Sequence, residues 1–172
     1  MRFYLGAALA VAPLLLGAQT PSRLAMIGEW EHQKKHALAV VDVAPDSMLG
    51  FRATPGVRTF AEQIIHAAGS GAYITAEALG IKPQDDLMGD KDVFLKNKAA
   101  LRSQTEKFYD YVLALLKAAP ESTLLRDAKV FDAAKPAWLW VATAHSHGTW
   151  TLGQTVPYLR MNNVKPPEFT PF

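Results

Sequence analysis

Apolar residues recur at helical spacing in four long segments of the chain. These segments cover residues 20–43, 59–80, 97–119 and 136–164. In the first segment, a single apolar stripe is formed by Leu24, Ile27, Trp30, Leu38 and Val41. The last segment is apolar on nearly every side, which is typical of a helix that has neighbours all around it. Because no alternating strand pattern competes with the helical one, the sequence predicts an all-α protein.

Local start and stop signals mark the ends of the first two segments. Thr20 followed by Pro21 predicts the beginning of the first helix, because Thr caps a helix and Pro is tolerated in its first turn. Thr59 and Glu62 form a capping-box pattern at the start of the second helix. Gly80 stands in the position that ends a helix in the left-handed conformation.

The connections between the segments are rich in polar residues, Gly and Pro. Residues 44–57 and 81–96 read as loops, and residues 121–135 are expected to hold one or two short helical turns. Pro157 predicts a bend in the last helix. Four helices joined by short to medium connections predict a four-helix bundle.

The first 18 residues have the pattern of a signal peptide. Arg2 supplies a small positive region, and residues 5–16 form an apolar run that is shorter than the roughly 20 residues a membrane span needs. Cleavage after Ala18 would leave residues 19–172 as one bundle domain. We therefore expect an exported protein, periplasmic or secreted, with no stable membrane anchor after cleavage.

Composition excludes some partners and one source of stability. The net charge is +2 and no block of basic residues is present, so we expect no nucleic-acid partner. The chain has no Cys, so no disulfide holds the fold and stability must come from an apolar core.

Polar residues of the first helix raise two questions. Glu31 and Lys34 lie on or near its apolar stripe, which indicates either a pocket or an ion pair at the end of the bundle. His32 and His36 are four residues apart, a spacing that suits a metal ion. At about 100° per residue, however, both point away from the apolar stripe, so we expect them on a solvated face.

The last helix carries two histidines on different sides. His145 and His147 are separated by about 200° around the helix, so they cannot serve one site. His145 shares an apolar stripe and is expected to be a hydrogen-bonded core or surface residue. Three polar residues follow on the side of His147: Thr151, Gln154 and Tyr158. His147 and His66 of the second helix are thus either metal ligands built from facing helices or hydrogen-bonded bundle residues.

Two stretches of the sequence resemble the DinB superfamily of four-helix bundles. Residues 46–69 read DSMLGFRATPGVRTFAEQIIHAAG, and residues 147–167 read HGTWTLGQTVPYLRMNNVKPP. The order and spacing of the four helices between them is the third point of likeness. The resemblance covers most of residues 19–172 and implies a DinB-like bundle.

The resemblance also implies a divalent metal ion, Zn²⁺ or Ni²⁺, bound by three histidines. His66 matches the first of these positions and His147 the second. The third position falls on Thr151. A Thr hydroxyl is a poor ligand for Zn²⁺ or Ni²⁺ because it remains protonated and neutral. Glu62 lies one turn from His66, but its capping position gives it another role.

Two functions remain open at this point. The first is an exported metal-dependent hydrolase or transferase that uses His66 and His147. The second is a non-catalytic bundle that binds a small molecule or a protein and has lost the metal. The sequence does not decide whether the chain is an enzyme, and the resemblance further implies a homodimer.

Overall fold

The computed structural model describes residues 22–83, 86–168 and 170 of the 172-residue chain. The predicted signal peptide, residues 1–18, lies outside these described residues. The long helices are α1 (Arg23–Val43), α2 (Phe60–Leu79), α4 (Lys98–Ala118) and α6 (Ala137–Gly153). The shorter elements are η1 (Asp46–Met48), α3 (Lys91–Phe94), α5 (Glu121–Leu125), β1 (Asp127–Val130), β2 (Ala133–Pro136) and α7 (Thr155–Met161). No helix in the described ranges is both long enough and apolar enough to span a membrane.

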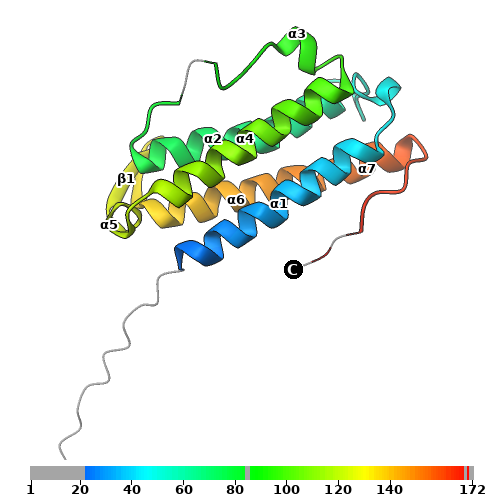
Figure 1. Cartoon of the computed structure of the whole chain (residues 1–172). Coiled ribbons are helices and arrows are strands. Elements are labelled where there is room, and N and C mark those ends of the chain that lie inside the picture. The colour runs from blue at the N-terminus through cyan, green and yellow to red at the C-terminus, as the bar shows by residue number, and fades with distance from the viewer. Residues whose placement is uncertain (1–21, 84–85, 169, 171–172) are drawn as a thin grey trace, which may run out of the picture.

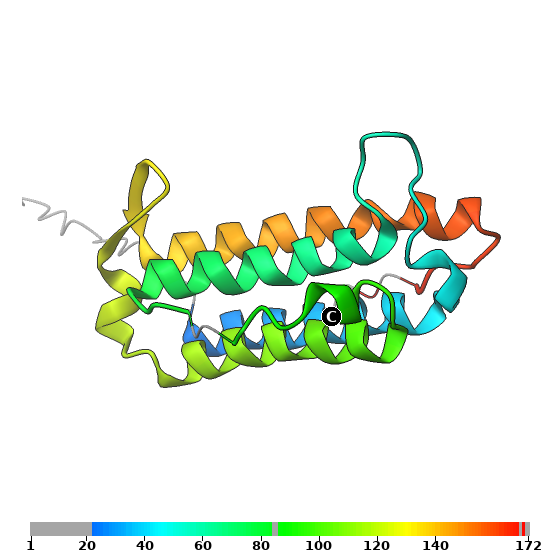
Figure 2. The same ribbon diagram turned by 90° about the horizontal axis from the view of Figure 1, so that it is seen from above.

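The four long helices form the predicted bundle (Figure 1). α2 packs on α4 and α6, and α1 packs on the same two helices from the other side, so α1 and α2 face each other across the diagonal. The segment between α2 and α4 runs back along the length of the bundle, and α2 and α4 therefore point the same way (Figure 2). This long crossover carries the short helix α3, which packs against α4 close to the start of that helix.

Side-chain caps define the helix ends as the sequence predicted, with one exception. Thr59 and Glu62 form a complete capping box at the start of α2, and Gly80 ends that helix with φ of 73°. At α1, the cap is Ser22, whose Oγ accepts a hydrogen bond from the amide of Ala25; the predicted cap, Thr20, lies outside the described residues. The predicted stripe of α1 is also wrong at Leu24, which is 77% exposed.

The last long helix is interrupted three residues before Pro157. α6 ends at Gly153, and α7 begins at Thr155, with Gln154 as a turn residue between them. Pro157 has no amide hydrogen to donate to the carbonyl of Gly153, and its ring would collide with that carbonyl in a straight helix. The amide of Gln154 instead bonds the carbonyl of Thr151 at 3.2 Å, which tightens the turn. Pro157 thus coincides with an interruption of the helix one turn before the proline.

A small β-hairpin replaces part of the helical turns expected over residues 121–135. α5 is followed by β1 and β2, which pair antiparallel from Asp127 opposite Pro136 to Val130 opposite Ala133. Phe131 occupies the two-residue turn with a φ of 53°. The strands have little apolar alternation, and only Val130 among their side chains is fully buried. A four-residue strand of this kind has no sequence pattern strong enough to predict it.

Trp30 joins all four long helices in the centre of the core. Its side chain on α1 is 1% exposed, and its ring lies 6.1 Å from the Tyr109 ring of α4 and 5.3 Å from the His145 ring of α6. On α2, a Cβ added to Gly71 would lie only 2.8 Å from Trp30 Cη2. Gly71 thus leaves the space into which the indole extends across the bundle diagonal.

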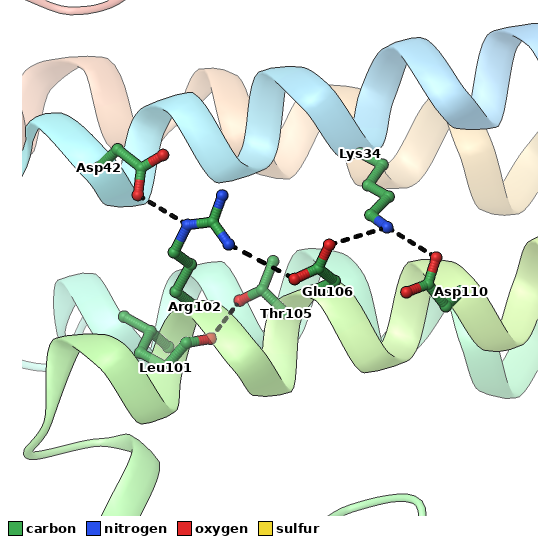
Figure 3. A network of polar contacts seen from close by, with 7 residues as sticks. All are labelled: Lys34, Asp42, Leu101, Arg102, Thr105, Glu106 and Asp110. Atoms are coloured by element: carbon green, nitrogen blue, oxygen red, sulfur yellow. Dashed lines mark hydrogen bonds and ion pairs between the residues drawn. The ribbon is translucent and has the colours of Figure 1, made fainter.

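Charged side chains connect α1 and α4 along their exposed edge (Figure 3). Lys34 contacts Glu106 at 3.1 Å and Asp110 at 2.7 Å, while Arg102 contacts Asp42 at 2.9 Å and Glu106 at 3.4 Å. Lys117 and Glu31 form a further pair between the two helices, at 3.3 Å. The polar residues near the stripe of α1 therefore form ion pairs. Because their partners are partly exposed, each pair contributes little stability, although together they favour one register of the two helices.

We expect Gly71→Ala to destabilise the fold because the added methyl group meets the rigid, buried indole of Trp30. The expected loss is about 1–3 kcal/mol in the free energy of unfolding, measured by urea denaturation. Gly28→Ala on α1 is the matched control, since a Cβ there meets nothing within 4 Å. That variant should gain about 0.5–1 kcal/mol from helix propensity alone. Equal effects of the two substitutions would contradict the central position of Trp30.

Candidate functional site

The structure brings His66 of α2 and His147 of α6 together. Their ring centroids are 5.1 Å apart, and the two planes meet nearly at right angles, at 83°. Both side chains are half-buried between the two helices. α2 and α6 run antiparallel and pack closely, so residues that are 81 positions apart in the sequence become neighbours. The facing-helix arrangement that the sequence analysis considered for these two histidines is thus present.

His66 is held by a second residue of its own helix. Its Nδ1 lies 3.2 Å from Oγ of Ser70, one turn further along α2. Burial lowers the pKa of His66, and the positive charges of Arg58 and of a protonated His147 lower it further. The imidazole is therefore neutral at pH 7. When Nδ1–H donates to Ser70, Nε2 keeps a lone pair that is available to a ligand.

Buried polar atoms without partners lie next to this pair. Nδ1 of His147 and Oγ1 of Thr151 are both buried, and neither has a hydrogen-bond partner among the described residues. Thr151 itself is 1% exposed. A buried donor or acceptor without a partner costs free energy, so such atoms call for an explanation in a native structure. Six other buried side-chain atoms of the described residues also lack partners, so it is the combination with the histidine pair that makes this place a candidate site.

Gln63 completes the polar cluster, and the sequence analysis did not single it out. Its Nε2 donates to the carbonyl of Thr151 at 3.3 Å and to Oε1 of Gln154 at 2.8 Å. Gln63 is buried and precedes His66 by one helical turn. An amide residue on the same helix face as His66 was the sequence signal that could have identified it. Tyr158 does not join the cluster through its hydroxyl, which donates to the carbonyl of Arg58 at 2.8 Å.

The donor atoms present suit a weakly held metal ion better than a tight one. Two imidazoles and one neutral hydroxyl are available, and the described residues contain no group of three or more His, Cys, Asp or Glu side chains placed to hold a metal. Glu62 cannot serve as the third ligand in its present position. Its carboxylate accepts from the amide of Thr59 at 2.7 Å and pairs with Arg52 at 3.1 Å. The hydrogen bond from Thr59 is also the main reason why the pKa of Glu62 is lowered.

His66 also lines an open cleft of about 570 Å³ beside α2. Its walls come from α2, from the loop that precedes α2 and from α3. The cleft contains the basic side chains Arg52, Arg58 and Lys91 and one carboxylate, Glu62. Much of the remaining lining is apolar and includes Val57, Ile65, Ile74, Met88, Phe94 and Leu95. A cleft of this size accommodates a small organic molecule.

A second cavity, of about 670 Å³, lies between α1 and α6. His32, His36 and His145 all line it, and His32 and His36 are half-buried, so the expected solvated face is only partly correct. The prediction missed this partial burial because α1 packs against both α4 and α6, and the side of α1 that contacts other helices is therefore wider than one apolar stripe. Burial lowers the pKa of His36, and His32 lowers it further. Nε2 of His145 lies 3.1 Å from the carbonyl of Glu29, to which it donates.

Half-buried histidines with a lowered pKa should make the fold sensitive to acid. Burial lowers the pKa of His145, with a smaller opposing effect of Glu29 and a further lowering by His32. The unfolded chain therefore binds protons more readily than the folded chain once the pH falls below about 6.5. We expect the free energy of unfolding to keep its full histidine contribution above that pH and to decrease progressively as the pH falls below it.

His145→Gln tests this expectation, because Gln can still donate to the carbonyl of Glu29 but does not titrate. Urea unfolding at pH 7.5 and pH 5.5 should show a smaller acid loss in the variant than in the parent chain. An identical loss in both would mean that His145 does not carry the pH dependence.

Comparisons with known proteins agree with this architecture. Neither a scan against protein-family models nor a search of curated proteins finds a match to the sequence. Among solved structures, a DinB-like protein from Bacillus cereus superposes with a TM-score of 0.72 at 18% identity, over 86% of this chain and 97% of that one. A DinB-like protein from Bacillus subtilis superposes with a TM-score of 0.68 at 12% identity, over 84% of this chain and 95% of that one. The DinB-like fold predicted from the sequence is confirmed: this chain has the bundle fold of the DinB-like proteins.

Proposed function

We propose that the chain is an exported DinB-like bundle that binds a small molecule beside α2 and holds a divalent ion, Zn²⁺ or Ni²⁺, weakly at His66 and His147. The observation that supports this proposal most directly is the contact of the two imidazoles beside the unpartnered Nδ1 of His147 and Oγ1 of Thr151. A ligand shared by these groups would satisfy atoms that otherwise remain buried without a partner.

The reaction class that fits such a site is hydrolysis or group transfer. A divalent ion with open coordination positions supplies Lewis-acid chemistry, by polarising an oxygen or lowering the pKa of a bound water. The chain's own residues would bind and orient the ion and its substrate. His66 and His147 would contribute two nitrogens, and Ser70 would fix the tautomer of His66 through its contact with Nδ1. The cleft beside His66 would admit the substrate from solvent.

The alternative is a non-catalytic bundle that binds a small molecule or a protein without metal. Thr151 in the third ligand position supports it, because two imidazoles and a hydroxyl hold Zn²⁺ or Ni²⁺ poorly. The cleft would then be the functional feature, and His66 would be one polar group on its wall. The homodimer implied by the family resemblance stays a prediction.

Metal content separates the two functions. The mature chain, purified without a His tag or a chelating column, should bind Zn²⁺ measurably in calorimetric titration if the first proposal holds. His66→Ala and His147→Ala should each reduce binding to background, whereas His32→Ala, the matched histidine control, should retain it. Less than about a tenth of an equivalent of metal, with no heat of binding, would favour the non-catalytic alternative. Loss of binding in His32→Ala alone would place the metal in the cavity between α1 and α6.

Restoring the third histidine should strengthen the site. Thr151→His would complete a three-nitrogen set with His66 and His147, and we expect its affinity for Zn²⁺ to rise by orders of magnitude. Because Thr151 is buried, the larger side chain should itself cost about 1–3 kcal/mol of stability. Zn²⁺ should then raise the melting temperature of Thr151→His far more than that of the parent chain or of Thr151→Val, a control of similar volume. Equal shifts in all three would show that Thr151 does not point to the ion.

A further inference from the structure

We propose that the ligand of the cleft beside α2 is a small amphipathic carboxylate whose anionic head binds Arg58 and Lys91 and whose apolar body packs on α2 and α3. This inference rests on the proposed function only in that both use the same cleft. It does not require a metal ion, so the two can fail separately.

The charges that line the cleft are unbalanced. Arg52, Arg58 and Lys91 face it together with a single carboxylate, Glu62. Glu62 pairs with Arg52 at 3.1 Å, so this acid neutralises the one basic residue that is already engaged. Arg58 and Lys91 form no ion pair with any described residue. The cleft therefore carries two uncompensated positive charges that attract an anion.

The backbone beside Arg58 is held by two hydrogen bonds, whereas the Arg58 side chain forms no ion pair with any described residue. The guanidinium of Arg52 donates to the carbonyl of Val57, and Tyr158 of α7 donates to the carbonyl of Arg58 at 2.8 Å. The backbone of residues 57–58 is thus attached both to Arg52 and to α7. Arg58 and His66 line the same cleft, and the positive charge of Arg58 contributes to the lowered pKa of His66. An anion bound to Arg58 would therefore share the cleft with His66.

The rest of the cleft suits an apolar body rather than a second charge. Ile65 and Ile74 of α2 are half-buried, and Met88 and Phe94 line the wall formed by the crossover segment and α3. Lys91 begins the single turn of α3 that ends at the buried Phe94, so charge and apolar surface alternate over a few residues. A ligand with an acidic head and a short hydrocarbon body would match both kinds of lining in a volume of about 570 Å³.

The cavity between α1 and α6 provides an internal contrast. It is the larger of the two, at about 670 Å³, yet Glu29 is its one acidic lining residue and no Lys or Arg of the described part lines it. An organic anion is therefore expected to select the cleft beside α2, whereas an organic cation would not be attracted there. Charge, rather than size, is the property that distinguishes the two cavities.

Octanoate and octylamine, which share a hydrocarbon chain and differ in charge, are the probes that test this inference. Binding to the mature full chain would be followed by amide chemical-shift changes in the presence of EDTA. Octanoate should bind with shifts centred on Ile65, Met88 and Phe94, and octylamine should not bind there. The affinity for octanoate should weaken with added salt, because the cleft is open to solvent and its charges are screened.

Charge-removing variants supply the second arm of the test. Arg58→Gln and Lys91→Gln should each weaken octanoate binding by about ten-fold, the usual effect of losing one charged hydrogen bond. Lys35→Gln is the matched control, since Lys35 is exposed on α1 and lines neither cavity. The inference is overturned if octylamine binds as tightly, if the shifts map to the cavity between α1 and α6, or if all three variants behave alike.

The same experiments separate this inference from the metal hypothesis. Octanoate binding that survives EDTA and His66→Ala would support the carboxylate site whether or not Zn²⁺ binds. Zn²⁺ binding that depends on His66, with octanoate binding unaffected by Arg58 and Lys91, would overturn the inference and leave the metal proposal standing.

Discussion

The contact of one tryptophan with all four long helices is the constraint on which the rest of this bundle depends. Trp30 extends from α1 through the core, with Tyr109 and His145 beside its ring and the bare backbone of Gly71 opposite it. Because interiors are close-packed, an indole in this position determines how closely the diagonal helices approach. It also fixes the rotation of α1, and with it the direction in which His32 and His36 point.

The separation of α2 and α6 decides what chemistry the bundle offers. α2 and α6 pack closely along their length, and α2 buries small residues such as Ala67, whose short side chains let helix backbones come close. At that distance His66 and His147 meet edge to face. Beside them, Nδ1 of His147 and Oγ1 of Thr151 have no hydrogen-bond partner among the described residues.

The two cavities on either side of this helix pair differ in electrostatics. The cleft beside α2 is lined by more basic than acidic side chains and by many apolar ones. His66, one member of the histidine pair, also lines it. The cavity between α1 and α6 is lined by three histidines and by a single acidic residue. A substrate that carries a negative charge would thus be delivered to the His66 side. On this view the anion site, which includes Arg58, lies in the same cleft as His66, the one member of the imidazole pair that lines it.

Local signals in the sequence determined the number of long helices, most of their ends and the helix faces that carry His66 and His147. Caps such as Thr59 with Glu62, the left-handed Gly80 and the missing amide of Pro157 act within one turn of the chain, so they can be read without a partner segment. Tertiary structure alone decided the hairpin of residues 127–136, whose short strands are stabilised by their neighbours rather than by their own pattern. It also decided the partial burial of His32 and His36, because a helix packed on two sides covers more of its circumference than its apolar stripe shows. The joining of Arg58 and Lys91 in one cleft depended on the path of the long crossover between α2 and α4, a contact between distant segments that no local pattern encodes.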